Sequence, residues 1–231
     1  MSSITFQVDV AGAARLARIL TIHDIDDTDS VYTSSAQGTP SDDSVLREDR
    51  SDEIPLHPYT LWKSRPLPDP RKVRPAEVFE ALGEIIYAED PIICERAFSL
   101  YSKAAGFQRL GADIKDALLR GLHSGIAKGH IHSGNELRKK DRLKNILSIA
   151  GRSHQLARES GGREFSEIPP SELVLLLESV ISAKGGGGDR NTIHREVVRI
   201  MGGSRLAVSA GEHLARVEEL LMESKEEEET K

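Results

Sequence analysis

Two histidines close together are the first side chains in this sequence whose type and spacing suggest chemistry. The segment G-H-I-H holds His130 and His132 two positions apart, so that in a strand both would face the same side. A zinc site needs three or four ligands. No nearby Cys, Asp or third His completes such a set, because His123 falls on the preceding predicted helix. We therefore expect contacts to phosphate or to a partner protein here, and no metal or other cofactor.

The remaining short motifs fail as sites for metal, nucleotide or nucleophilic chemistry. The acidic segment at 23–30 opens like a calcium loop but lacks the required glycine and the final acidic ligand. The segment G-G-G-G-D-R-N-T at 185–192 lacks the G-K-S/T of a phosphate-binding loop, and it predicts a slack connection with Asp189 or Asn191 capping the next helix. Neither G-x-S-x-G nor H-E-x-x-H occurs, so catalysis is not expected.

The charge of the chain is strongly segregated. Residues 71–158 carry 16 Lys and Arg against 10 Asp and Glu, whereas residues 1–70 carry 6 against 12 and residues 159–231 carry 9 against 15. A basic centre between acidic flanks has two interpretations. Either the centre binds an anionic partner such as DNA or another nucleic acid, or the segments attract one another.

A predicted helix at 109–128 carries four cations of the basic centre against Asp113 and Asp116, and five further cations follow the predicted wing. Cations at such positions neutralise phosphates, and no Arg and Asn pairing for base edges is evident, which predicts sequence-tolerant binding. The candidate nucleic-acid-binding residues are Arg109, Lys115, Arg120, Lys128, His130, His132, Arg138, Lys139, Lys140, Arg142 and Lys144.

An internal repeat organises the elements that must position these residues. Aligning Pro75 with Pro170 places Glu77 on Glu172, and apolar residues with the spacing of an amphipathic helix follow both prolines. Proline at the first helical position and an acid in the first turn are typical of helix starts. Each second helix then ends at a glycine, Gly106 or Gly202, where a left-handed residue is usually needed.

Third helices complete both copies. After the first copy, the segment S-G-I-A-K-G-H-I-H-S-G-N-E-L predicts a helix end, a short strand, a turn and a second short strand, which is the layout of a winged helix. The second copy has no equivalent wing, and its last helix runs into a charged tail that we expect to be disordered.

The predicted fold is mainly α, with two tandem three-helix, winged-helix-like units. We divide the chain into an acidic, partly disordered N-terminal region with a proline-rich arm, a first unit with a small β-wing, a basic connector with a possible helix in 138–162, a second unit, and an acidic tail. The arm is predicted to be extended and anchored on the first unit by Tyr59 and Trp62. The boundaries are 1–70, 71–134, 135–165, 166–224 and 225–231.

The Gly-x-x-Arg spacing recurs as Arg109 and Arg205. In a structural interpretation, each arginine holds a helix end or pairs with the first-turn Glu77 or Glu172. In a functional one, Arg109 contacts a phosphate. The presence of Arg205 in the acidic copy favours the structural role.

These motifs resemble an uncharacterised domain from the C-terminal end of very large bacterial proteins. Those proteins look like superfamily-one helicases that also carry a restriction-endonuclease-like domain. The resemblance covers about 60–224 and depends on an Ile-x-Pro-x-Glu opening and a later Gly-x-x-Arg. It implies a helicase or nuclease partner in DNA processing or defence. The matching residues are Ile168, Pro170, Glu172, Gly202 and Arg205, with Gly106 and Arg109 in the other copy.

Composition sets the remaining limits. One cysteine, Cys94, excludes an internal disulfide, and neither a secretory signal nor an apolar run long enough for a membrane span occurs, which predicts a cytoplasmic location and no membrane partner. A homo-oligomer is compatible with the sequence. We expect a non-catalytic accessory module that binds nucleic acid through the first unit and a protein through the second. The alternative is a protein-interaction scaffold without nucleic-acid binding.

Overall fold

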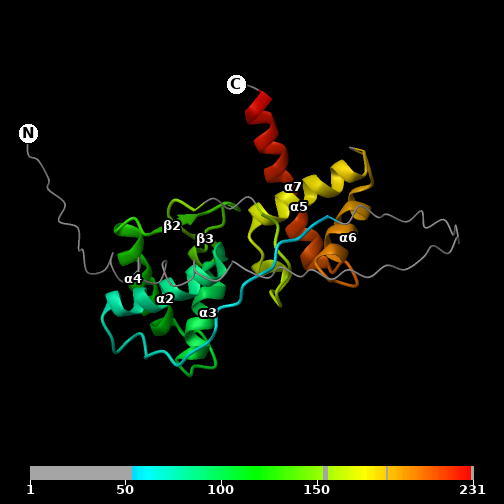
Figure 1. Ribbon diagram of the computed structural model, residues 1–231. Helices are drawn as coiled ribbons and strands as arrows, with labels where there is room; N and C mark the ends of the chain where they lie inside the picture. Colours follow the sequence, from blue (N-terminus) through cyan, green and yellow to red (C-terminus); the bar gives the residue numbers. More distant parts are fainter. Residues whose placement is uncertain (1–53, 153–155, 186, 230–231) are drawn as a thin grey trace, which may run out of the picture. The chain divides into compact units, whose positions relative to one another are not determined.

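Six α-helices and one small antiparallel sheet form the regular structure of the described residues. The computed structural model describes residues 54–152, 156–185 and 187–229, and the features predicted for residues 1–53 lie outside them. The chain is mainly α, and none of its described helices has the length and apolar character to cross a membrane. The elements in chain order (Figure 1) are α2 (Pro75–Glu89), β1 (Ile92–Ile93), α3 (Cys94–Ala104), α4 (Ala112–Ala127), β2 (Ile131–Gly134), β3 (Ile146–Ile149), α5 (Pro170–Ala183), α6 (Arg190–Ile200) and α7 (Val208–Glu229).

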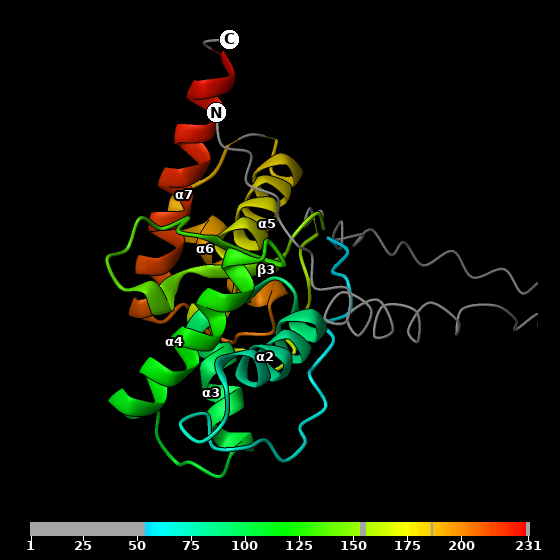
Figure 2. The ribbon, with the colours of Figure 1, turned by 90° about the vertical axis from the view of Figure 1, so that its left-hand side faces the viewer.

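Helices α2, α3 and α4 pack around one apolar core, and we call them with the sheet the first bundle. Helix α2 begins at Pro75, where a missing N–H costs no hydrogen bond, and buries one face through Val78, Leu82 and Ile85. Helix α4 lies directly against α2 (Figure 2). A Cβ at Gly125 would lie 1.9 Å from the ring of Phe79, so only glycine permits this close approach.

The sheet differs from the predicted hairpin. Strand β3 lies in the centre and pairs antiparallel with β2 on one side and β1 on the other. The partner of β2 is thus Ile146–Ile149, not the segment directly after the Ser133 turn. Leu147 is completely buried, so pairing β3 with both neighbours removes a strongly apolar strand from water. The predicted helix in the connector is also wrong, because this segment supplies β3 and a short 3-10 turn at Arg142–Lys144.

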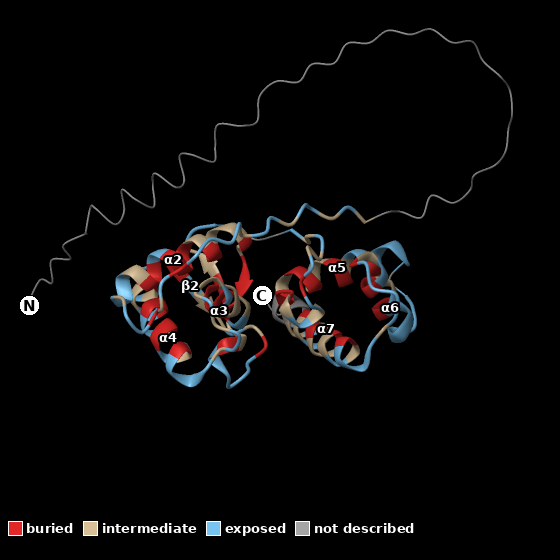
Figure 3. Cartoon of the chain, turned by 90° about the horizontal axis from the view of Figure 1, so that it is seen from below, coloured by how far each residue is buried: buried red, intermediate tan, exposed pale blue. Residues whose placement is uncertain are grey.

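Helices α5, α6 and α7 form the second bundle around a separate core (Figure 3). Asp189 caps α6 by accepting a hydrogen bond from the Thr192 N–H at 3.1 Å. Helix α7 continues to Glu229, so the expectation of a disordered tail is wrong for residues 225–229. The third helix of the first bundle also begins later than predicted, at Ala112 and not at 109.

The two bundles end their second helices in the same way. Gly106 and Gly202 both have a φ of +84°, in the left-handed region. The next N–H groups then reach back to close the helix, from Phe107 to the Ser102 carbonyl and from Gly203 to the Val198 carbonyl. This pair of bends satisfies backbone groups that would otherwise be unpaired at the helix ends.

Residues 54–74 form no helix or strand and contact both cores. Trp62 and the buried Leu67 pack on the first core, whereas Ile54 and Leu56 pack on the second. The Leu67 N–H donates to the Ala104 carbonyl at 3.1 Å. All described residues belong to one compact part of the chain, which spans residues 49–231.

Candidate nucleic-acid interface

The loop between β2 and β3 gathers five of the predicted cations. Because β2 pairs with β3, residues 135–145 form a connection that begins and ends at the same end of the sheet. We call this segment the basic loop. Its cations, against Glu136 and Asp141, are Arg138, Lys139, Lys140, Arg142 and Lys144.

Polar groups within the basic loop fix its shape. The Asn135 side chain accepts from the Lys139 N–H at 2.9 Å and donates to the Lys139 carbonyl at 2.8 Å. Arg138, inside this turn, has a φ of +50°, which is uncommon for a residue with a side chain. Asp141 accepts from the Leu143 N–H at 3.0 Å and caps the 3-10 turn. The loop therefore presents its cations from a defined backbone.

Two leucines fasten the basic loop to the rest of the molecule. Leu143 is buried in the core of the first bundle and Leu137 in the core of the second. Beside Leu137, the Glu136 carboxylate accepts from the Ser171 N–H at 3.0 Å, at the start of α5. Burial raises the pKa of Glu136 above its ordinary value. The anchors leave the middle of the loop facing solvent.

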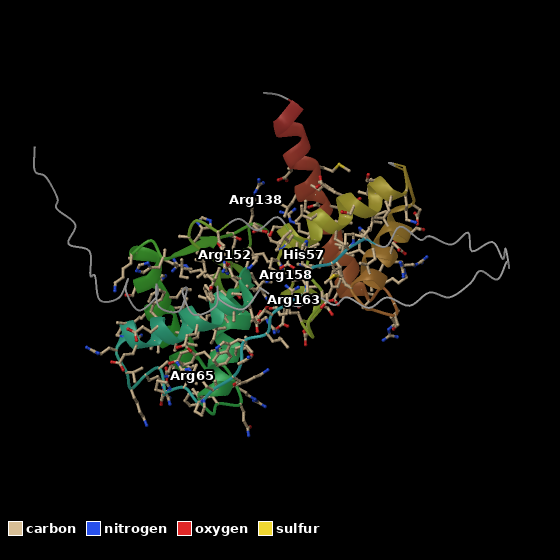
Figure 4. The ribbon with its side chains drawn as sticks, in the orientation of Figure 1. His57, Arg65, Arg138, Arg152, Arg158 and Arg163 are labelled. Carbon is tan, nitrogen blue, oxygen red and sulfur yellow. The ribbon has the colours of Figure 1, made fainter. Side chains whose placement is uncertain are left out.

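The five cations of the loop differ in their partners. Lys144 pairs with Glu95, and Arg138 lies 3.1 Å from the Glu223 carboxylate of α7 (Figure 4). The other three, Lys139, Lys140 and Arg142, are exposed and make no ion pair with the described residues. A cluster of unpaired cations on a fixed loop is suited to attract a polyanion.

The remaining predicted cations do not join this cluster, with one exception. Lys115, on the first turn of α4, lies 4.0 Å from Asp141 of the loop. Arg109 is exposed in the turn before α4, Arg120 is exposed in its middle, and Lys128 follows its end. Because a helix rises about 1.5 Å per residue, a cation before α4, one in its middle and one after its end lie too far apart to form a single cluster.

The two histidines of the G-H-I-H segment have separate surroundings. His130 precedes β2 and stacks on Phe79, with ring centroids 6.0 Å apart and planes 14° apart. His132 is exposed on β2 opposite Ser148, and with Glu136 and Arg152 it lines a cleft of about 480 Å³. No group of three or more potential metal ligands occurs in the described residues.

Cys94 is buried in the first bundle at the start of α3. Burial raises the pKa of its thiol to about 12. Its sulfur is therefore protonated at neutral pH and a poor nucleophile.

The predicted partners of Arg109 and Arg205 are wrong. Glu77 pairs with Arg74, one turn before it, at 2.6 Å. Glu172 is buried and pairs with arginines from the preceding loop. Both Arg109 and Arg205 are exposed, and neither pairs with Glu77 or Glu172.

A buried ionic network, absent from the sequence-based prediction, connects the two bundles. Glu89, at the end of α2, accepts from the Tyr59 hydroxyl and from the Arg96 guanidinium, both at 2.6 Å. Arg96 also donates to Glu167 at 2.8 Å. Burial, together with the hydrogen bond to Glu89, raises the pKa of Tyr59. The available signal was that Glu89 falls on the apolar face of α2, four positions after Ile85.

The second half of the network surrounds Glu172. Arg163, itself buried, donates to both oxygens of this carboxylate at 3.0 and 3.1 Å. Arg158 also donates to Glu172 and reaches the Pro91 carbonyl at 2.8 Å. Both arginines lie over the ring of Tyr59, at 4.8 Å for Arg158 and 3.9 Å for Arg163 (Figure 4). Both guanidinium groups are thus paired with Glu172 within the chain, although the Nε of Arg158 has no hydrogen-bond partner among the described residues.

No protein-family model, no curated protein and no solved structure matches this chain. The candidate interface is therefore defined by its own geometry, as an exposed basic loop anchored between two cores.

Proposed function

We propose that this protein is a non-catalytic accessory module whose first bundle binds nucleic acid through the basic loop. The observation that carries the proposal is the set of three exposed cations, Lys139, Lys140 and Arg142, without ion pairs among the described residues and held between two buried leucines. Because the backbone of the loop is already ordered, binding to phosphates costs only the freedom of these side chains, and counterion release favours binding.

We further propose that the first bundle is a winged helix. Its order of elements, helix, strand, two helices, strand, loop and strand, supports this assignment. The basic loop is then the wing, and it is longer than the hairpin expected from the sequence. A wing with this charge would lie against the phosphate backbone.

The surface of α4 supports a sequence-tolerant mode of binding. Its exposed residues include Asp113 and Asp116 beside Arg120. Carboxylates on that face oppose deep insertion into a groove lined by phosphates. Contacts from the basic loop and Lys115 would position the nucleic acid without reading its bases.

The second bundle is proposed to contact a protein. Its segment of the chain is acidic, with 9 Lys and Arg against 15 Asp and Glu in residues 159–231. Such a surface repels phosphate. Val208 and Met222 are exposed on α7, at 80% and 53%. The resemblance to helicase-associated domains makes a helicase or nuclease the proposed partner, with residues 54–74 acting as an arm across both bundles.

Fluorescence anisotropy with labelled duplex and single-stranded DNA tests nucleic-acid binding. We expect binding that weakens about 40-fold between 50 and 200 mM salt, as three phosphate contacts imply. Changing Lys139, Lys140 and Arg142 to Glu should weaken binding at least tenfold. The control is the triple change of Lys63, Lys103 and Lys184 to Glu, which alters the net charge equally at exposed positions outside the loop.

The two variants separate the proposed functions. Equal weakening by both triple changes would contradict a role of the loop and indicate a general effect of charge. Absence of binding by the wild-type chain at micromolar concentration and 50 mM salt would leave the protein-interaction scaffold as the better hypothesis.

A further inference from the structure

One face of the small sheet forms the floor of a cleft. Side chains alternate along a strand, so Ile131 and Leu147 are buried in the first core, whereas His132 and Ser148 lie on the opposite face. Gly134 shares this second face and has no side chain. A Cβ placed there would lie 3.7 Å from Nε2 of His132, so the imidazole reaches over the backbone of Gly134. The cleft has a volume of about 480 Å³, within the range of about 300–1,000 Å³ of sites for small ligands.

An acidic group lies at one end of this cleft. Glu136 is near the start of β3, because it follows by two residues Gly134, which pairs with Ile146. Its carboxylate accepts from the Ser171 N–H at 3.0 Å, and a carboxylate has room for further donors. Burial raises the pKa of Glu136, whereas the Ser171 N–H and the nearby His132 oppose this rise. A hydrogen-bond acceptor therefore lies close to the imidazole ring.

A basic group lies at the other end. Arg152 is three residues beyond Ile149, the last residue of β3. Its guanidinium lies 3.4 Å from the Asp90 carboxylate and 4.7 Å from the centre of the Tyr87 ring, while 44% of the side chain stays exposed. A guanidinium has five N–H donors, so the contact with Asp90 leaves others for an anion. Because the four residues of β3 extend for about 10–13 Å, the two ends are separated by a distance comparable to the length of one nucleotide.

The cleft adjoins the basic loop. Glu136 belongs to both, and Lys139 and Lys140 follow it by three and four residues, so their backbones lie at most about 14 Å from that of Glu136. A polyanion on the loop thus has the cleft within reach of a neighbouring nucleotide. A peptide or a small zwitterion would also match the two charged ends, but only a nucleic acid would use the exposed cations beside the cleft as well.

We infer that the cleft receives one unpaired nucleotide of a strand bound to the basic loop. This inference rests on the proposed function and names its ligand as a single strand. The base lies against the imidazole of His132, an N–H of its edge donates to Glu136, and its phosphate meets Arg152. Stacking accepts any base, in agreement with sequence-tolerant binding. In a duplex the base must first be withdrawn from its stack, so a duplex does not use the cleft.

Substitutions in the full-length chain test the cleft with three probes. The probes are a labelled single-stranded DNA of mixed sequence, the duplex that it forms with its complement, and an abasic strand of the same length, which keeps the phosphates and lacks the bases. His132→Ala removes the ring, and Ser148→Phe fills the cleft. The controls His123→Ala and Ser209→Phe make the same changes at exposed positions of α4 and α7. Anisotropy titrations at low salt measure affinity, and circular dichroism verifies that each variant is folded.

We expect H132A and S148F each to weaken single-strand binding about tenfold, as the loss of one base stacked on a ring implies. Affinity for the duplex and for the abasic strand should not change, because neither offers a free base. The two controls should bind all three probes like the wild type. If S148F does not fold, H132A decides the outcome, since position 132 is exposed.

Two results would overturn the inference while leaving the proposed function intact. One is single-strand binding that H132A leaves unchanged although the triple change of Lys139, Lys140 and Arg142 to Glu weakens it. The other is similar weakening by H132A for all three probes, which would assign His132 a contact with phosphate and not with a base. If the wild type binds none of the probes, the proposed function and this inference are both contradicted.

Discussion

The two bundles share their helix ends and differ in what surrounds them. Both begin a first helix at proline, at Pro75 and Pro170, and both end a second helix at a glycine with a φ of +84°. Only the first bundle, among the described residues, adds strands, and only there does a loop extend between two of them. The comparison shows that local helix signals can be repeated while the exposed surface, and with it the proposed function, diverges.

The first-turn acids of the two bundles make this divergence specific. The Glu77 side chain is 42% exposed and pairs with Arg74 on the surface. The Glu172 side chain is 5% exposed and holds two arginines beneath the Tyr59 ring. The same position of the repeat therefore forms a surface ion pair in the first bundle, as Glu77, and part of the buried network between the bundles in the second, as Glu172.

Substituting these two acids should give the largest difference between the bundles. Glu172→Gln should lower the free energy of unfolding by about 3 kcal/mol, because it leaves Arg163 buried with no opposite charge. Glu77→Gln should cost less than about 1 kcal/mol, as expected for an exposed pair. Urea unfolding followed by circular dichroism measures both. A loss for Glu172→Gln as small as about 1 kcal/mol, the value of an exposed pair, would show that the network around Glu172 does not stabilise the protein.

Alanine at the two helix-ending glycines should reveal where the bundles remain alike. Gly106→Ala and Gly202→Ala should each cost about 1–2 kcal/mol, since a left-handed backbone is unfavourable with a Cβ. Open space surrounds both positions, so a steric clash would not contribute. Gly83→Ala, inside α2 and also in open space, is the control and should stabilise the protein by about 0.5 kcal/mol. Clearly different losses of stability for Gly106→Ala and Gly202→Ala would show that the two helix ends are not energetically equivalent.

Acidification should lower the stability of the second bundle through His194 and His213. We expect this change in stability to be smaller than those of the substitutions above. Burial lowers the pKa of His194, which faces Glu218 and Arg190, and of His213, which faces Lys139 and Lys144, below the ordinary 6.5. The unfolded chain then binds more protons, so their contribution to stability is complete above pH 6.5 and declines as the pH falls below it.

Urea midpoints at pH 7.5 and 5.5 measure this effect in the wild type and in a variant with Gln at 194 and 213. The variant should lose less stability on acidification than the wild type. His123→Gln, which removes an exposed histidine of α4, should behave like the wild type. An unchanged pH dependence in the double variant would assign the acid sensitivity to other groups.

The helices were predictable because their signals are local. Apolar spacing, Pro75, Pro170, and the two glycines each act within one or two turns, and the segment before α6 supplies its own cap in Asp189. The sheet was not predictable in the same way, because its strands are short: β1 has two residues and β3 has four. Short apolar runs of this kind do not distinguish strand, helix and connector.

The candidate site was predicted in part for the same reason. The cations of the basic loop were recognised from their density in the sequence, but the strand that follows them was missed, so the loop was described as a hairpin and a connector. Lys144 and Arg138 proved to be paired with Glu95 and Glu223, which lie far away in the chain. Charge density predicts that a segment attracts anions, whereas the availability of each cation depends on its neighbours in space.

The sequence by itself determined the helices, their ends, and the sign of the charge along the chain, since these depend on residues within a few positions of one another. Tertiary structure alone decided that β3 joins β2 and β1, that Glu172 is buried with Arg158 and Arg163, and that three cations of the loop stay unpaired among the described residues. The physical reason is distance along the chain. Sheet pairing and burial depend on contacts between segments that local propensity does not encode.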